Sequence, residues 1–248
     1  MIDTNFDFTT DTPHYWKNYW EKDTLLGSPA SDPDSLSKTM QLYQKILYSK
    51  PLPNGKTMEL KVGCGANYLT WENFRFGSDS ILASFRYANY RNMIKCVADY
   101  LPNYHEFMEN YIHKAYTIGG EIIFPKGKGS INQNRGWNPR IKDRWDLTLE
   151  CIRRFYSGEE NPLQDTLLRN KDFFDLFVDF KGYVDFFFLQ DCVSEDYNHV
   201  EFWIGNGSFE LLPLPQTVEE YLLWIEKELE FVSKRNARIS QAFNLYPH

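Results

Sequence analysis

The basic residues between Glu121 and Asp143 are the part of this sequence whose types and spacing could do chemistry. No Asp or Glu lies between those two positions, although the formal net charge of the chain is -7. The cations in this interval are Lys126, Lys128, Arg135, Arg140 and Lys142. A glycine-containing loop exposes backbone N–H groups, and the amino end of a helix carries partial positive charge. The pattern therefore favours binding of an anion.

Gly127 and Gly129 lie in the same loop, but the surrounding residues fit neither G-x-G-x-x-G nor the P-loop pattern. The loop is thus not identified as a known nucleotide motif. A solvated hairpin whose lysines keep an exposed edge soluble is the alternative interpretation. We expect Arg135 and Arg140 to be loop side chains whose removal leaves folding nearly unchanged.

A helix is expected to begin at Asp143 and to carry a wide apolar arc, in which Arg144 is embedded. The apolar stripe consists of Trp145, Leu149, Ile152 and Tyr156. Because an unpaired buried charge costs several kcal/mol, Arg144 must meet either an internal carboxylate or an anionic ligand. It is then an internal ion pair or the floor of an anion site. The candidate anion-binding residues are Lys126, Lys128, Arg135, Arg140 and Arg144.

Acidic residues on the opposite face of this helix allow two interpretations. Asp143, Asp146 and Glu150 are spaced to share a face and could hold Mg²⁺, which prefers carboxylate and water ligands. Glu150 also lies three and four residues before Arg153 and Arg154, which is ordinary helix pairing and is favoured here. We therefore predict no metal site and no cofactor, and the sequence identifies no catalytic residue and leaves open whether the protein is an enzyme.

The cysteines and the hydropathy pattern restrict the class of protein. Cys64, Cys96, Cys151 and Cys192 form no C-x-x-C pair, so we expect reduced core thiols, with Cys64 in a structural turn. No signal-like segment and no apolar run long enough for a membrane span is found. The sequence predicts a cytoplasmic protein without membrane association.

The composition and the local patterns predict the fold that positions these residues. Hydrophobic residues make up 42% and aromatic residues 17% of 248 residues, which supports a large core. We expect an α+β fold, with residues 1–248 forming one helix-rich globular domain that has a small, mainly antiparallel sheet. Helices are expected at 13–20, 36–50, 78–90 (capped by Ser78), 91–101, 103–116, 143–156, 161–170, 171–193 and from Thr217 onward; strands are expected at 57–62, 67–71 and 199–204.

Several strings of the sequence resemble those of a known family. They are TIGGEIIFP, DRWDLTLECIRRFY, NPLQDTL, DFFDLFVDFKGYVDFFFLQD and FVSKRNARI. In these the chain is similar to a family of bacterial cytoplasmic proteins of about this size, known as a domain of unknown function. The resemblance implies one domain in a bacterial cytoplasm, and it implies no activity or catalytic residue.

Two functions remain open at the level of sequence. The first is an anion-recognising cleft formed by the basic loop 125–142 and the following helix, for the phosphate of a nucleotide or nucleic acid. The second is a non-catalytic protein-protein interaction module whose charged residues are structural. The expected partners are accordingly a phosphate-bearing ligand, a nucleic acid or another protein.

Overall fold

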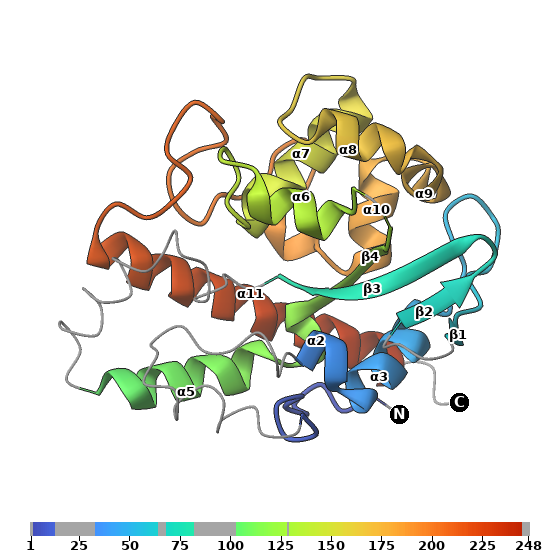
Figure 1. The fold of residues 1–248 in the computed structure, drawn as a ribbon, viewed down its shortest axis with the longest axis horizontal. Helices are drawn as coiled ribbons and strands as arrows, with labels where there is room; N and C mark the ends of the chain where they lie inside the picture. Colours follow the sequence, from blue (N-terminus) through green and yellow to red (C-terminus); the bar gives the residue numbers. More distant parts are fainter. Residues whose placement is uncertain (1, 13–32, 64–67, 82–102, 128, 245–248) are drawn as a thin grey trace.

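A small antiparallel sheet lies at the centre of the fold (Figure 1). The computed structural model describes residues 2–12, 33–63, 68–81, 103–127 and 129–244. Within these ranges the strands are β1 (Lys61–Val62), β2 (Tyr68–Trp71), β3 (Phe74–Ser80) and β4 (Glu121–Pro125), in the spatial order β1-β2-β3-β4. Every pairing between neighbours is antiparallel. The predicted α+β class with a small antiparallel sheet is confirmed.

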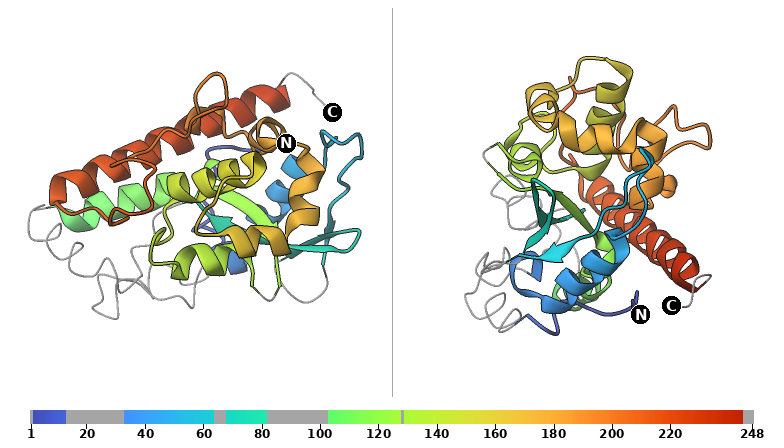
Figure 2. Two further views of the ribbon diagram at one scale, coloured as in Figure 1. Left: turned by 90° about the horizontal axis from the view of Figure 1, so that it is seen from above. Right: turned by 90° about the vertical axis from the view of Figure 1, so that its right-hand side faces the viewer.

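Helices cover both faces of this sheet, as the perpendicular views in Figure 2 show. On one side lie α6 (Ile131–Trp137), α7 (Trp145–Ser157), α8 (Gln164–Arg169), α9 (Lys171–Phe174) and α10 (Phe180–Phe187). On the other side lie α2 (Pro33–Leu36), α3 (Lys38–Tyr48) and α5 (Tyr104–Ala115). Short 3-10 turns complete the described elements: η3 (Ile118–Gly120), η4 (Asp175–Phe177) and η5 (Gln190–Cys192). The helix α11 (Val218–Asn244) packs against α5 and η3.

Side-chain caps and left-handed residues explain where several helices begin and end. Ser37 accepts a hydrogen bond from the Met40 N–H at the start of α3, and Asp179 accepts one from Gly182 at the start of α10. Gly158 adopts φ 72° and ends α7, a conformation that glycine takes without a steric cost. Thr217 accepts from the Glu220 N–H at 3.1 Å, so the predicted cap of the last helix is confirmed.

Aromatic rings make up much of the core between α7, α9 and α10. Phe173 and Phe177 lie 5.1 Å apart between ring centroids, and Tyr183 lies 4.9 Å from Phe187. All four side chains are fully buried. The prediction that 171–193 forms buried, aromatic-rich helices is confirmed, and these rings hold α10 against the body of the molecule.

The prediction of a strand at 199–204 is wrong. Val200 makes an isolated bridge with Val193, and the backbone that follows is hydrogen-bonded by side chains from the start of α7. The Trp203 N–H donates to Asp146, and the Ile204 carbonyl accepts from Arg144. Because Asp146 and Arg144 form hydrogen bonds with these two polar backbone groups, the groups are satisfied without a neighbouring strand.

Ser78 was expected to cap a helix, and this prediction is also wrong. Ser78 lies inside β3 and pairs with Ile123 of β4. Pairing with β4, which is more than forty residues away in the chain, overrides the local helical pattern. The expected helices at 13–20 and 91–101 lie outside the described residues. Within the described part of the chain, no helix has the length and apolar character needed to cross a membrane.

Candidate functional site

Arg135 lies on α6 and is completely buried, so the expectation of an exposed loop side chain is wrong. Its Nη1 lies 2.8 Å from Asp79 Oδ2 and 3.3 Å from Asp143 Oδ1. Further donors reach the Ser80 carbonyl at 3.0 Å and the Asp143 carbonyl at 2.8 Å. Arg135 therefore joins α6 to the end of β3 and to the segment before α7. It is an internal cross-link, and we expect its removal to destabilise the fold.

Arg144 occupies the position just before the first residue of α7 and is buried as well. Its Nε donates to Asp146 Oδ1 at 3.0 Å, and Nη2 donates to the other carboxylate oxygen of Asp146. Its remaining contacts are the carbonyls of Pro213 at 2.9 Å and Ile204 at 2.8 Å. Of the two alternatives for Arg144, the geometry matches the internal ion pair, because a carboxylate and two carbonyls occupy its donors.

The acidic residues expected on the polar face of α7 are all buried. Asp146 pairs with Arg144, and Glu150 accepts from both Arg153 at 2.8 Å and Arg154 at 2.7 Å. The predicted pairing of Glu150 with the two arginines is confirmed. Among the residues that the structure describes, no three His, Cys, Asp or Glu side chains form a group that could hold a metal ion.

The backbone immediately before α7 is strained. Lys142 has φ 50° and Asp143 has φ 68°, in the left-handed region that costs non-glycine residues energy. Burial raises the pKa of the Asp143 carboxyl from its ordinary value of 3.8 to about 7; Arg135 opposes the shift, and Asp79 adds to it. The contacts of Arg135 hold this segment in place, because the backbone carbonyl and the carboxyl of Asp143 both face the Arg135 guanidinium.

Lys126 is exposed at the end of β4, and its side chain runs beside Gly77 of β3. It does not line the pocket that contains Arg140. Lys128 lies outside the described residues. The structure thus separates the described candidate residues: Arg135 and Arg144 are internal, Lys126 is on the sheet edge, and Arg140 lines an open pocket.

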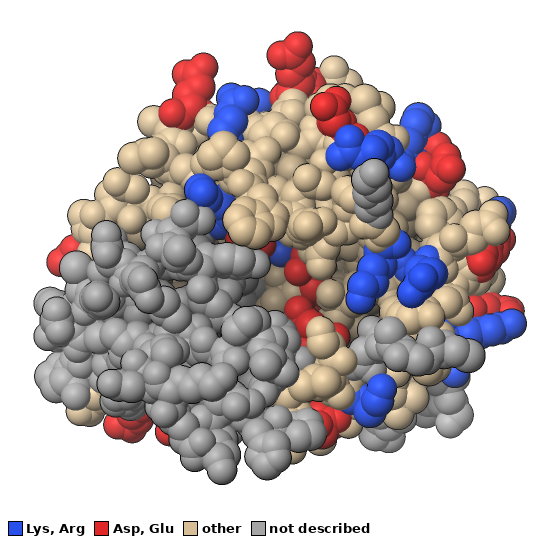
Figure 3. Space-filling model, viewed as in Figure 1, with Lys and Arg blue, Asp and Glu red and all other residues tan. Residues whose placement is uncertain are grey.

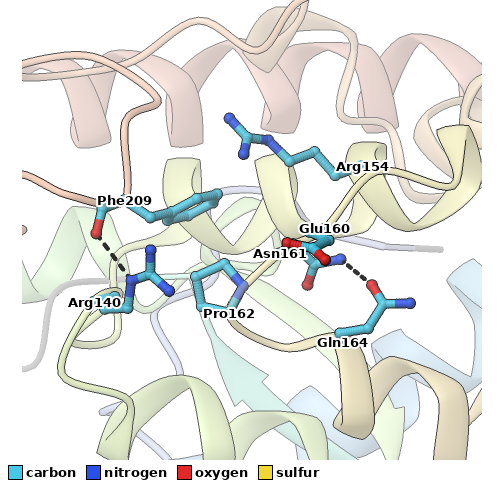
Figure 4. A pocket seen from close by; sticks show the side chains of 7 residues that line it. All are labelled: Arg140, Arg154, Glu160, Asn161, Pro162, Gln164 and Phe209. Atoms are coloured by element: carbon cyan, nitrogen blue, oxygen red, sulfur yellow. Dashed lines mark hydrogen bonds between the residues drawn. The ribbon is translucent and has the colours of Figure 1, made fainter.

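Arg140 lies between α6 and α7, at a pocket of about 380 Å³ that Figure 4 shows from close by. Its Nε donates to the Phe209 carbonyl at 3.0 Å, which fixes the side chain against the loop that precedes α11. Within the described part of the chain, neither Nη1 nor Nη2 of Arg140 has a hydrogen-bond partner. This guanidinium therefore keeps donors available at the pocket.

Arg154 of α7 supplies a second guanidinium to the pocket. Its Nε pairs with Glu150, its Nη2 donates to the Gly207 carbonyl at 3.2 Å, and its guanidinium carbon lies 4.8 Å from the Phe209 ring centroid. Glu150 also pairs with Arg153, which has a second carboxylate partner in Glu159 at 3.0 Å. The two guanidinium groups of the pocket thus lie on either side of Phe209, which belongs to a third segment of the chain (Figure 4).

The remaining polar groups of the pocket come from the start of α8. The Asn161 amide donates to Gln164 Oε1 at 2.7 Å, and its own oxygen accepts from the Leu163 N–H at 3.0 Å. This arrangement orients the Gln164 amide and leaves its NH₂ group as a donor. Glu160, which is exposed, is the carboxylate among the lining residues. The pocket therefore offers mostly donors, with one acceptor that favours a ligand carrying hydroxyl or amino groups.

Sequence reasoning missed most of this pocket. Arg154 was assigned only to pairing with Glu150, which is correct but incomplete. Tertiary packing brings Phe209, Asn161 and Gln164 close to Arg140, and no local sequence pattern predicts this arrangement. A second arginine one turn beyond Glu150 was the only signal in the sequence that could have suggested a site here.

The described cysteines, Cys151 and Cys192, are free and fully buried. Burial raises the pKa of both thiols above the ordinary range. Because the thiolate is the reactive form, both are unreactive core side chains. Their prediction as reduced core thiols is confirmed; Cys64 and Cys96 lie outside the described residues.

Comparison with known proteins places the chain in a family. Residues 2–239 match the family described as "Family of unknown function (DUF6994)", which covers nearly the whole chain. Comparisons with curated proteins and with solved structures found no match. Of the resemblance seen in the sequence strings, the membership of a family of unknown function is thereby confirmed: the chain belongs to the family DUF6994.

Proposed function

We propose that this protein binds a small phosphate-bearing ligand of nucleotide size in the pocket between Arg140 and Arg154. The observation that carries the proposal is the arrangement of these two guanidinium groups around one hollow, with both Nη atoms of Arg140 unbonded within the described residues. Arginine donates through a planar fork that suits phosphate oxygens.

The pocket volume favours a small molecule over a nucleic acid. About 380 Å³ lies within the range of about 300–1,000 Å³ typical of small-molecule sites. On the face shown in Figure 3, the described Lys and Arg side chains are interspersed with Asp and Glu instead of forming a continuous basic surface. Proteins that bind nucleic acid along its backbone usually need such a surface.

The experiment is a calorimetric titration of the protein with ATP and with inorganic phosphate, at about 50 mM and about 200 mM salt. The variant Arg140→Gln removes the charge and shortens the side chain. We expect its Kd for ATP to rise about tenfold or more, because one charge-assisted hydrogen bond contributes about 1.5–3 kcal/mol.

Arg238→Gln is the matched control for net charge. Arg238 lies on α11 and pairs with Asp191, and it does not line the pocket. Its replacement should leave the Kd for ATP unchanged at both salt concentrations. Equal losses in the two variants would show a general electrostatic attraction, and an undiminished affinity in Arg140→Gln would reject the proposed pocket.

A second candidate function, a protein-protein interaction module, is favoured by two exposed apolar side chains. Trp137 at the end of α6 is 76% exposed, and Leu212 is 73% exposed. Tryptophan often anchors protein interfaces. Since Arg140 lies three residues after Trp137, the partner would be an acidic segment. A Glu-rich peptide should then bind the protein and lose affinity in Trp137→Ser, a variant that leaves ATP binding unchanged.

A bacterial cytoplasmic setting is part of the same proposal. It is supported by the family resemblance and by the free thiols of Cys151 and Cys192, since reducing compartments keep cysteines unpaired. Cell fractionation of the source organism with antibody detection tests it. Recovery of the protein in an oxidising compartment or in a membrane fraction would reject it.

A further inference from the structure

A second pocket, of about 480 Å³, lies between the loop after α3 and the helix α10. Pro51, Leu52 and Pro53 form one wall, and Gly182 and Phe186 of α10 form another. A Cβ on Gly182 would lie 2.1 Å from the Phe177 carbonyl oxygen and 3.1 Å from Pro53 Cγ, so a larger residue at this position would require the backbone at Phe177 to shift. The pocket shares no residue with the one around Arg140.

Lys50, whose side chain ends in a primary amine, is one of the residues that line this pocket. Its Nζ donates to the Phe186 carbonyl at 2.6 Å and lies 3.8 Å from the ring centroid of Phe188. The Phe186 carbonyl belongs to the last turn of α10, where carbonyls lack partners within the helix. The neighbouring Phe187 carbonyl accepts from Arg235 at 3.0 Å. Two cations from distant segments thus converge on one helix end.

This crowding changes the electrostatics of the amine. Burial and, to a smaller extent, the charge of Arg235 lower the pKa of Lys50 to about 7, and Asp185 opposes this shift. The Phe186 carbonyl and the Phe188 ring also favour the ammonium form, as cation acceptors do. Nearby Lys181 and Asp185 are paired with each other, and Asp179 caps α10, so neither carboxylate is dedicated to Lys50.

An amine that loses its proton near neutral pH is a nucleophile. With a pKa of about 7, about half of the Lys50 side chains are neutral at pH 7. An ordinary lysine is neutral in roughly one molecule in 2,500 at that pH. Lysines desolvated in this way, or placed next to another cation, react with carbonyl compounds.

We propose that Lys50 is a covalent attachment site, where its amine forms an imine with a small, uncharged aldehyde or ketone held in this pocket. The apolar walls and the balanced charges of Lys181 and Asp185 favour an uncharged ligand. The neutral amine adds to the carbonyl carbon to give a carbinolamine, which then loses water. Both hydrogens of the amine nitrogen leave with the carbonyl oxygen in that water, so no oxidant or reductant is required.

The test is reductive trapping with propanal and sodium cyanoborohydride, in which hydride from the reagent reduces the imine to a stable secondary amine. Limiting reagent is applied to the folded protein near pH 7, and peptides are mapped by mass spectrometry. We expect Lys50 to be modified at least tenfold faster than Lys171, Lys181 and Lys234, which are more than half exposed and paired with carboxylates. In urea this preference should disappear.

Lys50→Arg is the matched variant, because arginine keeps a cation at the Phe186 carbonyl and removes the amine. It should remain folded, bind ATP as the unchanged protein does, and lose most of the early propanal incorporation. The proposal is overturned if Lys50 reacts no faster than the three reference lysines. It is equally overturned if incorporation into Lys50→Arg is undiminished. Neither outcome bears on the Arg140 pocket.

Discussion

At the scale of single residues, buried arginines are held by backbone carbonyls as much as by carboxylates. Arg235 of α11 donates to the carbonyls of Gly119, Glu121 and Phe187 and to the Tyr48 hydroxyl, and it is completely buried. Arg144 likewise combines one carboxylate with two carbonyls. Because a guanidinium has five donors, one such side chain can connect several segments at once.

The first prediction concerns Arg144. Arg144→Met keeps much of the aliphatic volume but leaves Asp146 as a fully buried carboxylate without its cation. We expect the free energy of unfolding to fall by about 3–5 kcal/mol. Urea denaturation measures it, with Arg238→Met as control; that variant breaks an exposed pair and should cost about 1 kcal/mol or less. An unchanged stability of Arg144→Met would contradict the internal role.

The second prediction concerns Asp143, whose pKa is raised by burial from 3.8 to about 7. The folded protein then keeps this proton to higher pH than the unfolded chain does. The contribution of Asp143 to the free energy of unfolding therefore falls as pH rises from about 4 to about 7 and is constant above that window. Each unit of pKa difference corresponds to about 1.4 kcal/mol.

Asp143→Asn removes the titration, so stability should improve relative to the unchanged protein as pH rises through this window. Denaturation curves at a series of pH values measure the difference. Asp175→Asn is the control, since Asp175 is exposed and pairs with Lys171. Parallel pH profiles for the unchanged protein and Asp143→Asn would show that Asp143 does not titrate in this range.

At the scale of elements, the contact of α11 with η3 depends on a glycine. A Cβ on Gly119 would lie 2.5 Å from the Val232 carbonyl oxygen and 2.7 Å from Asn236 Oδ1. The Gly119 N–H also donates to that Asn236 oxygen at 2.7 Å. Any side chain at this position must push α11 away from the body of the molecule.

The third prediction is that Gly119→Ala destabilises the protein by about 1–3 kcal/mol, the usual cost of overpacking. Gly127→Ala is the matched control: nothing lies within 4 Å of its Cβ position, and a change within about 0.5 kcal/mol is expected. Thermal melts of the two variants measure the difference. Similar melting temperatures would show that α11 adjusts freely at this contact.

The sequence predicted the elements whose signals are local. The stripe of α7, the capping of α11 by Thr217 and the aromatic helices up to α10 follow from spacing within one segment. The prediction of a strand at 199–204 was wrong because side chains at the start of α7 form the hydrogen bonds of that backbone. The prediction of a helix cap at Ser78 was wrong because Ser78 lies in a strand that pairs with β4, which is distant in the chain.

At the scale of the whole molecule, the helices and the sheet share one hydrophobic core across the described residues. That all of 1–248 forms one domain remains a prediction. The burial of Arg144 could be predicted from its place in the apolar arc, whereas the burial of Arg135 could not, because its carboxylate partner Asp79 is distant in the chain and no local pattern predicts its contact with Asp143. The Arg140 pocket likewise requires three segments to meet, and only the fold brings them together.

In the proposed function an anion binds at Arg140 and Arg154, whereas Arg135 and Arg144 form internal contacts that hold segments of the fold together. The most direct measurement is an NMR titration with inorganic phosphate that follows the Nε–Hε resonances of the arginine side chains, assigned with Arg→Lys variants. We predict saturable shifts at Arg140 and Arg154 and none at the two internal arginines. Shifts at Arg135 or Arg144, or no saturable shift at Arg140, would contradict the account.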